Sequence, residues 1–331
     1  MIYTCANCGG NVIFDPKSQH MKCPQCDAED SEKAQSSSRH QEQSRLQCQA
    51  CGAPLNIKKE TTACKCEYCG TYHVIESRLK GEKRPHVVMP FRLTKDEVIA
   101  CIAKSVGSRT YAPDDFLSKK TIEKMEGRYV PFWLYDYDLD AVYKGVGTKV
   151  RTWRSGNYVY TETSYYNIYR NMEFNYNKIP ADASEAMADD VMDLLEPFDY
   201  NDLYDFKEKY LSGFLGRSYT YTAHEMAPRA KEKAESSAKA LVQETIQGYS
   251  STNGKLNFDY KAENQNYTLL PIWIYDFKYQ GKTYSFHVNG QSGQVVGIAP
   301  IDRRRVIGYS MAFTAMSAII AALIYCVIGV I

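Results

Sequence analysis

The sequence predicts an α+β protein built from two small cysteine-rich modules, a tyrosine-rich antiparallel α+β domain with an internal duplication, and one C-terminal transmembrane helix. Three observations predict this class. Eight of the eleven cysteines lie at repeated spacings within the first seventy residues. Most of the 27 tyrosines lie in the central region, and the last stretch, 306–331, contains no charged residue. A chain of 331 residues with a net charge of +1 is long enough for two or three folded units and an anchor.

The cysteines form two copies of one pattern. In each copy two C-x2-C pairs are separated by fourteen residues, and the second copy follows the first at an offset of 43. Four thiolates in this arrangement suit a tetrahedral zinc ion. The sequence therefore predicts zinc ribbon 1 at residues 1–27, zinc ribbon 2 at 47–76, and two structural Zn²⁺ ions. The predicted ligands are Cys5, Cys8, Cys23, Cys26, Cys48, Cys51, Cys66 and Cys69.

Other uses of these cysteines are less consistent with the sequence. Disulfides need an oxidising compartment, and the polar N-terminus, which already holds two ligands, does not resemble a secretory signal. An iron–sulfur cluster or a redox-active dithiol remains an alternative, although this spacing is more typical of structural zinc. Four sulfur ligands leave no open coordination position, so we expect these sites to stabilise the fold and not to catalyse.

Composition sets the remaining boundaries. Residues 28–46 are polar and lack an apolar stripe, which predicts a flexible linker between the ribbons. A charged stretch at 77–84 predicts a second linker, and the aromatic-rich α+β domain is expected at 85–300.

This domain contains an internal echo. The segment V-P-F-W-L-Y-D-Y at 130–137 resembles L-P-I-W-I-Y-D-F at 270–277, and the offset is 140. Each segment reads as a strand that begins near proline and continues with large apolar residues. The echo predicts two related halves packed into one sheet system.

Local signals predict the other elements of this domain. A helix is expected after Thr94, which has Glu97 at the capping-box spacing. A hairpin turn is expected at 153–158 and a final hairpin at 272–298. Further helices are expected at 184–195, 201–211 and 225–247.

The C-terminal region, 301–331, predicts a basic stop followed by a membrane anchor. Residues 306–331 are long and apolar enough to cross a hydrocarbon core of about 30 Å. Arg303, Arg304 and Arg305 precede this segment, and the positive-inside rule places them in the cytoplasm. We therefore expect a single-pass, tail-anchored protein of the cell membrane whose soluble part faces the cytoplasm. Small residues every fourth position could support oligomers through close helix contact: Ser310, Thr314, Ala318, Ala322 and Cys326.

Motifs for catalysis are largely missing from the sequence. It has no phosphate-binding loop, no dinucleotide fingerprint and no nucleophile elbow. His224 and Glu225 begin like a zinc-protease helix, but Pro228 occupies the position of the second histidine. Asp136 and Asp276 occupy equivalent positions of the echo and could form an acid/base pair, yet a structural hydrogen bond is the better explanation for each. We expect no catalytic residues, no cofactor-binding residues and no enzymatic activity.

Charge argues against nucleic acid as a partner. Residues 1–83 carry eleven Lys and Arg against ten Asp and Glu. Two zinc centres of four thiolates each would add a formal charge of minus four, because eight thiolates would meet two dications. No basic stripe follows from this balance, although a membrane-tethered nucleic-acid-binding or transcription-regulating protein stays open as an alternative.

The chain resembles a bacterial family of membrane-anchored double zinc-ribbon proteins, often labelled TFIIB-type zinc ribbon or helicase-like proteins. Three parts of the sequence carry the resemblance: C-A-N-C-G-G-N-V-I-F-D-P at 5–16 with C-P-Q-C at 23–26, V-P-F-W-L-Y-D at 130–136, and Y-S-F-H-V-N-G-Q-S-G-Q-V-V-G-I-A-P at 284–300. The helicase label has no support because no nucleotide-binding motif is present. An additional cysteine, Cys64, leaves the fourth ligand of the second site open to question.

The resemblance implies a place in envelope-stress modules beside SPFH/virion-core-like and phage-shock-type membrane proteins. We therefore expect a non-enzymatic adaptor or scaffold that recruits protein partners at the inner face of the membrane. The closed metal sites, the anchor and the missing catalytic motifs agree with this expectation.

Overall fold

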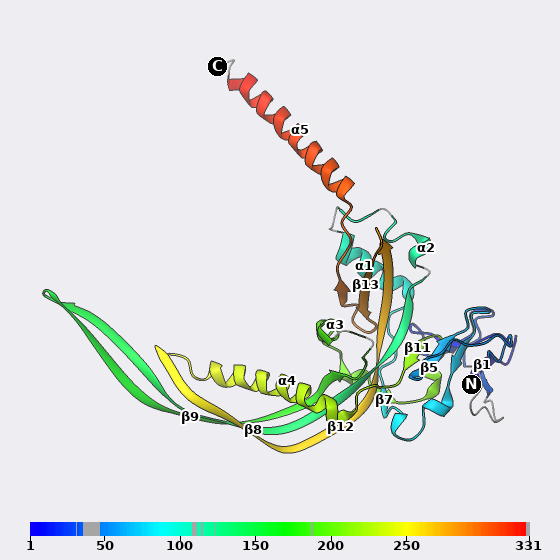
Figure 1. Cartoon of the computed structure of the whole chain (residues 1–331), viewed down its shortest axis with the longest axis horizontal. Helices are drawn as coiled ribbons and strands as arrows, with labels where there is room; N and C mark the ends of the chain where they lie inside the picture. Colours follow the sequence, from blue (N-terminus) through cyan, green and yellow to red (C-terminus); the bar gives the residue numbers. More distant parts are fainter. Residues whose placement is uncertain are drawn as a thin grey trace.

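The computed structural model describes residues 1–30, 32–35, 47–107, 111–113, 115–122, 124–185, 187 and 189–328. Figure 1 shows a sheet-rich body with the N-terminal region at one end, a long curved arm, and an apolar C-terminal helix that leaves the body separately. The helices are α1 (Lys95–Gly107), α2 (Lys119–Ile122), α3 (Asp189–Leu194), α4 (Ala223–Glu244) and α5 (Arg303–Ile328). The N-terminal strands are β1 (Ile2–Cys5), β2 (Ile13–Phe14), β3 (Met21–Lys22), β4 (Glu32–Gln35), β5 (Thr61–Lys65) and β6 (Tyr72–Val74). The body strands are β7 (Val87–Val88), β8 (Glu126–Ser155), β9 (Tyr158–Asp182), β10 (Tyr204–Asp205), β11 (Leu215–Arg217), β12 (Ser251–Tyr279), β13 (Lys282–Asn289) and β14 (Val295–Gly297).

The central pair β8 and β12 contains both copies of the echo. These strands run antiparallel, and Val130 lies opposite Leu270, its own equivalent at the offset of 140. A local two-fold axis therefore passes between these two residues. Strand β9 extends the sheet beyond β8, and β13 extends it beyond β12 in the equivalent position. The expectation of two related halves in one sheet is confirmed. The sheet is mixed, however, because β7 and β11 pair parallel to β12 and β8.

The duplication includes the preceding strand and helix of each half. Both α1 and α4 begin with a capping box, formed by Thr94 with Glu97 and by Thr222 with Glu225. The Trp133 indole N–H donates to the carbonyl that precedes Thr222 (2.9 Å), and the Trp273 indole N–H donates to the carbonyl that precedes Thr94 (3.1 Å). Each half therefore uses one buried tryptophan to hold the start of the other half's helix against the sheet.

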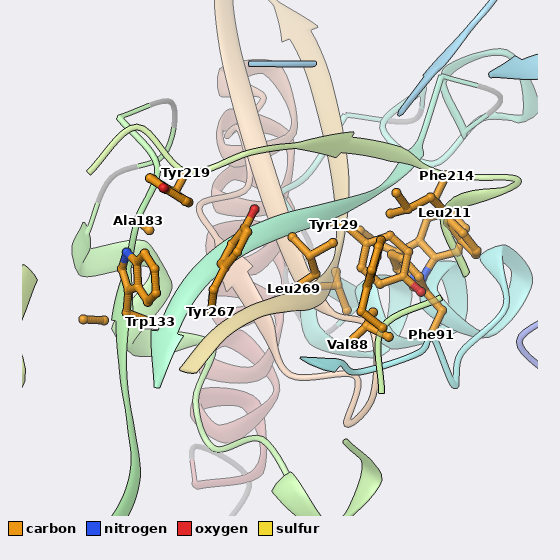
Figure 2. Packing of buried hydrophobic residues seen from close by; sticks show 14 of the residues in the cluster. Val88, Phe91, Tyr129, Trp133, Ala183, Leu211, Phe214, Tyr219, Tyr267 and Leu269 are labelled. Atoms are coloured by element: carbon orange, nitrogen blue, oxygen red, sulfur yellow. The ribbon is translucent and has the colours of Figure 1, made fainter. Parts of the chain in front are cut away.

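Aromatic rings fill the core around the two-fold axis. Trp133 packs against Tyr219 at 5.2 Å between ring centroids, and Trp273 packs against Phe91 at 5.3 Å. Figure 2 shows Phe91, Tyr129 and Phe214 together in one part of this core, with Phe91 and Phe214 stacked at 4.0 Å. The aromatic composition of the central region thus supplies the packing of one continuous core.

The halves differ most in the length of their hairpins. The β12–β13 hairpin turns at 280–281, whereas β8 and β9 continue to a turn at 156–157 and form a long arm. The first part of β12 runs along this arm as a third strand as far as the Ser251–Thr148 pair. Helix α4 lies along the concave side of the arm (Figure 1). It buries small residues at four-residue spacing, which allow close contact with the sheet: Ala230, Ala234, Ala238 and Val242.

The N-terminal region packs directly on the body. Strand β5 pairs with β11, which pairs with β8, so one sheet joins the second cysteine module to the core. The expected linker at 77–84 consists mainly of 3-10 turns and contains the fully buried Leu79. Within the expected flexible linker at 28–46, Glu32–Gln35 forms β4 against β1, while residues 31 and 36–46 lie outside the described residues. The described parts of the two modules are therefore packed against the domain and are not connected to it by a flexible linker alone.

Two expectations about helices need correction. The segment 201–211 contains short 3-10 turns (Tyr200–Asp202 and Glu208–Leu211) around β10 and is not an α-helix. Tertiary contacts explain the difference, because β10 pairs with β7 and Asp202 forms an ion pair with Arg92 at 2.5 Å. Within the helix expected at 184–195, the described residues form α3, whereas the helix expected at 225–247 is confirmed as α4.

Helix α5 is long and apolar enough to cross a bilayer. None of its apolar window, Arg303–Ile324, is buried against the rest of the protein. Its start is held near the body, since the backbone N–H of Asp302 donates to the carbonyl of Tyr111 (2.8 Å) and the ring of Tyr309 packs edge-on against Tyr111. An apolar helix with its sides exposed needs a non-aqueous environment or a partner.

Candidate metal centres and their surroundings

The four C-x2-C pairs adopt one local structure. In each pair the N–H of the fourth residue after the first cysteine donates to that cysteine's carbonyl, as in Gly9 to Cys5 and Gly70 to Cys66. The donating residue has a positive φ in all four turns: 73° at Gly9, 57° at Asp27, 75° at Gly52 and 76° at Gly70. Glycine adopts this conformation without steric cost, and aspartate tolerates it better than most residues. These turns aim both cysteines of a pair toward the same point.

The pairs meet in two clusters, and each cluster contains the four predicted ligands. Within each cluster all four sulfur atoms lie within 4.8 Å of one another. In the first, Cys5 and Cys26 are 3.6 Å apart and Cys8 and Cys23 are 3.5 Å apart. Sulfur atoms at about 2.3 Å from a central ion would be separated by about 3.8 Å in a tetrahedron. A disulfide would require about 2.05 Å. The geometry therefore fits a metal ion, and the eight predicted ligand residues are brought together as expected.

The second cluster has the same geometry. Its cross-pair distances are 3.5 Å between Cys48 and Cys69 and 3.8 Å between Cys51 and Cys66. The additional Cys64 lies on β5 and is buried, but it is outside the group of four. Burial raises the pKa of the Cys64 thiol to about 11, which keeps it protonated. The fourth cysteine of this cluster is Cys69.

Each site has an inner and an outer side. The first cysteine of each pair is buried, whereas the second is exposed: Cys8, Cys26, Cys51 and Cys69. On the inner side of the second site, the Nε2 atom of His73 lies 3.2 Å from the sulfur of Cys48. Burial lowers the pKa of His73 to about 4, so the ring is neutral at pH 7 and can donate one N–H to a thiolate. Sequence reasoning missed His73, and the cysteine repeat gives no signal for it because the equivalent position in the first copy is Asp30.

The first site is attached to the body by its β2 strand. The backbone N–H of Phe14 donates to the carbonyl of Ser212 (2.9 Å), and the Ser212 hydroxyl donates to the carbonyl of Val12 (2.6 Å). Gly213 has a φ of 97° and faces Ile13 so closely that an added Cβ would lie 2.9 Å from it. The Phe14 side chain is buried and packs against the ring of Tyr210 at 5.1 Å. This attachment makes the site part of the domain core.

The two aspartates of the echo do not meet. Asp136 accepts a hydrogen bond from the backbone N–H of Lys178 (2.8 Å), where the β8–β9 register shifts, and Asp276 accepts one from the hydroxyl of Ser285 (2.6 Å). Asp136 lies opposite Asn264 on β12, twelve positions before Asp276. At about 3.3 Å per residue this corresponds to about 40 Å along the strand. The pair therefore cannot act on one substrate, and each carboxylate has a structural hydrogen bond.

A cleft of about 1100 Å³ separates the second cysteine module from the start of β8. Five basic side chains and two carboxylates, Glu67 and Glu126, line it. Arg128 lies 3.6 Å from Glu126, and burial together with the charge of Arg217 lowers the pKa of Arg128. The basic residues are Lys58, Lys65, Lys124, Arg128 and Arg217. The sequence did not predict this concentration of positive charge, because the fold combines residues from three separate segments.

Two four-cysteine clusters that fit metal ions, a sheet-rich α+β body and one exposed apolar helix define the class of this protein. No protein-family model matches the chain, and no solved structure matches it. The chain is 34% identical over 311 residues to the "Uncharacterized protein YdjG" of Bacillus subtilis (strain 168), and the match covers 92% of this chain and 91% of that protein. The chain belongs to the same family as YdjG.

Proposed function

We propose that this protein is a zinc-containing membrane adaptor that recruits protein partners at the cytoplasmic face of the cell membrane. The observation that carries the proposal is the combination of two four-cysteine centres, fixed on a rigid body, with a helix whose apolar sides are exposed. A metal that is fully ligated by sulfur has no position for substrate, so its contribution is to hold a surface in shape. Zinc is proposed for both sites because four thiolates at this spacing suit it.

The recruiting surface would be rigid, since the modules are packed on the body. Its most exposed large side chain is Tyr68, which lies between Cys66 and Cys69 at the second site and is 73% exposed. An exposed aromatic residue on a rigid turn loses little entropy on binding and is typical of energetically important contacts. The equivalent turn of the first site presents Gln25.

The proposed partners are SPFH/virion-core-like or phage-shock-type membrane proteins, in a response to membrane stress. This part of the proposal rests on the family resemblance of the sequence alone. The basic triplet before the apolar helix supports the cytoplasmic orientation by the positive-inside rule. The small-residue stripe from Ser310 to Ala322 supports association of two α5 helices as a further proposal.

Crosslinking and affinity purification of the full chain from intact membranes tests the adaptor role. We expect the combined Tyr68→Ala and Gln25→Ala variant to lose partners that the wild type retains, while Tyr204→Ala, an exposed tyrosine on β10, retains them. Point variants are preferable to deletion of residues 1–83, because deletion would expose the core that β5 and β2 cover. If the combined variant keeps the complete set of partners, recruitment through the cysteine modules is wrong.

Nucleic-acid binding is the second candidate, and the basic cleft is the observation that favours it. Phosphate contacts through lysine and arginine would make binding strongly dependent on salt. We expect a single- or double-stranded oligonucleotide to bind the detergent-solubilised chain at low salt, and Arg217→Gln with Lys124→Gln to weaken it. No measurable binding at low salt would eliminate this candidate.

A further inference from the structure

The outer end of the arm has a surface that the adaptor role does not use. We call residues 149–166 the ribbon tip: it comprises the last part of β8, the turn at 156–157 and the first part of β9. Strand β12 pairs with β8 only as far as Thr148, so beyond this point two strands continue without the third. Their cross-strand register continues to the Ser155–Tyr158 pair at the turn. A two-stranded ribbon has little core of its own and is only marginally stable in water.

The ribbon tip exposes an unusual amount of apolar surface. Its large side chains are between 42% and 73% exposed, although a soluble surface usually shows such residues singly. Tyr249 and Ser250 contact the base of the ribbon tip at Tyr166 and Val150, and beyond them no other described strand pairs with the ribbon (Figure 1). These residues are Val150, Trp153, Tyr158, Val159, Tyr160, Tyr165 and Tyr166.

One face of the ribbon tip combines aromatic rings with cations. Trp153 lies opposite Tyr160, and their rings stack at 5.7 Å. The guanidinium of Arg151 lies 5.5 Å from the Trp153 ring, and the ammonium of Lys149 lies 5.5 Å from the Tyr166 ring. Cations above aromatic faces are attracted by the ring quadrupole while they remain accessible to anions.

The charge of the ribbon tip is positive. It contains Lys149, Arg151 and Arg154 against a single carboxylate, Glu162, whereas the whole chain has a net charge of only +1. The opposite face of the ribbon tip carries Val150 and Val159 between threonines. Its one cation is Arg154, which lies beside the turn. Three cations are few for a nucleic-acid surface. Their combination with tryptophan and tyrosine is typical of proteins at the membrane–water interface.

We propose that the ribbon tip binds the headgroup region of a bilayer that contains anionic phospholipids, as a second membrane contact beside α5. The proposal rests on the anchoring role of α5 proposed above. Figure 1 shows the arm curving so that its end lies on the side toward which α5 leans. Because α5 would already hold the chain at the bilayer, the second contact would be intramolecular, so a weak affinity would suffice. Each cation near an anionic surface strengthens such a contact about fivefold.

Trp153 provides a specific probe of this contact. The other two tryptophans, Trp133 and Trp273, are only 8% and 7% exposed, so the difference between wild-type and Trp153→Phe fluorescence reports the ribbon tip. The full chain would be reconstituted in vesicles of phosphatidylcholine alone or of equal parts phosphatidylcholine and phosphatidylglycerol. With phosphatidylglycerol we expect blue-shifted Trp153 emission, protection from acrylamide and quenching by brominated lipid. Arg151→Gln should reduce the bound fraction relative to the unbound about fivefold, and Lys255→Gln elsewhere on the arm should not.

Several results would overturn the proposal. Trp153 emission that is equally water-exposed in both kinds of vesicle, without quenching by brominated lipid, excludes the bilayer contact. If the protection of Trp153 from acrylamide depends on the ratio of protein to lipid and not on phosphatidylglycerol, the ribbon tip binds a second copy of the chain instead. Protection that appears only after addition of a single-stranded oligonucleotide identifies nucleic acid. Whether the protein floats with the vesicles after an alkaline wash reports the membrane insertion of α5 independently. If the protein still floats while Trp153 remains exposed to water, only the contact of the ribbon tip is refuted. Circular dichroism of each variant verifies that the fold is kept.

Discussion

Replacement of Cys8 by serine should remove one metal ion and loosen part of the body. Cys8 is exposed, so the substitution removes a ligand without disturbing packing. Structural zinc contributes an apparent binding free energy of about 10–16 kcal/mol in small zinc modules. That is comparable with the total stability of a domain, about 5–15 kcal/mol. Loss of one of four thiolates should therefore be sufficient to open the first site.

The effect should extend beyond the site itself. Val12, Phe14 and Met21 are at most 1% exposed, and burial of each such side chain contributes about 1.5–3 kcal/mol. Opening of the first site would forfeit about 5–9 kcal/mol of this burial. It would also release the hydrogen bonds between β2 and Ser212. We therefore expect increased amide hydrogen exchange in residues 1–30 and in residues 206–214, which lie far away in the sequence.

Two measurements on the purified full chain test this reasoning. Elemental analysis should give two zinc ions per chain for the wild type and for Cys101→Ser, a cysteine outside both clusters, and one for Cys8→Ser. Hydrogen exchange should then rise in both segments only for Cys8→Ser. If Cys8→Ser retains two ions, the ligand assignment is wrong. If residues 206–214 keep wild-type protection after the ion is lost, the coupling between the site and the body is wrong.

The remaining predictions concern the duplicated body and its attachments. Trp133→Phe and Trp273→Phe should each destabilise the protein by about 1–3 kcal/mol, because each leaves a carbonyl at a helix start without its hydrogen-bond donor. Trp153→Phe, at an exposed position, should change the stability by less than about 0.5 kcal/mol. Denaturant unfolding followed by circular dichroism measures this, and equal effects at all three positions would contradict the structural role of the two buried tryptophans. Ala234→Leu should cost about 1–3 kcal/mol in the same assay, since α4 is too close to the arm for a larger side chain, and a neutral effect would show that the helix can move away. Gly216→Val should separate β11 from β5, because even a Cβ at this position would lie 2.7 Å from the Thr62 hydroxyl. Amide hydrogen exchange in β5 should therefore rise. Unchanged protection of β5 would argue against close contact between Gly216 and Thr62.

The adaptor proposal and the ribbon proposal place different demands on the same fold. In the adaptor proposal, partner recruitment depends on exposed residues such as Tyr68 in the cysteine modules. In the ribbon proposal, the lipid contact depends on Trp153 in the ribbon tip. Variants at these two positions therefore separate the functions, because neither side chain belongs to the core.

Several features of the fold could be predicted because their signals are local. The capping box at Thr94, the hairpin turn at 156–157 and the proline-led echo are all contained within a few residues of sequence. The segment 201–211 was predicted wrongly because its conformation is set by pairing with β7 and by the ion pair between Asp202 and Arg92. No short stretch of sequence contains those partners.

The sequence by itself determined the eight cysteines of the two clusters and the apolar C-terminal helix. A metal site of this kind is encoded by two tight turns whose cysteine spacing is local, and an apolar helix is encoded by continuous composition. Only the tertiary structure decided how the parts combine. It fixed the cysteine modules to the body through β5 and Ser212, separated Asp136 from Asp276, and placed seven large apolar side chains at the exposed end of an arm. Each of these results depends on strand register and on packing between distant segments, which local sequence patterns do not specify.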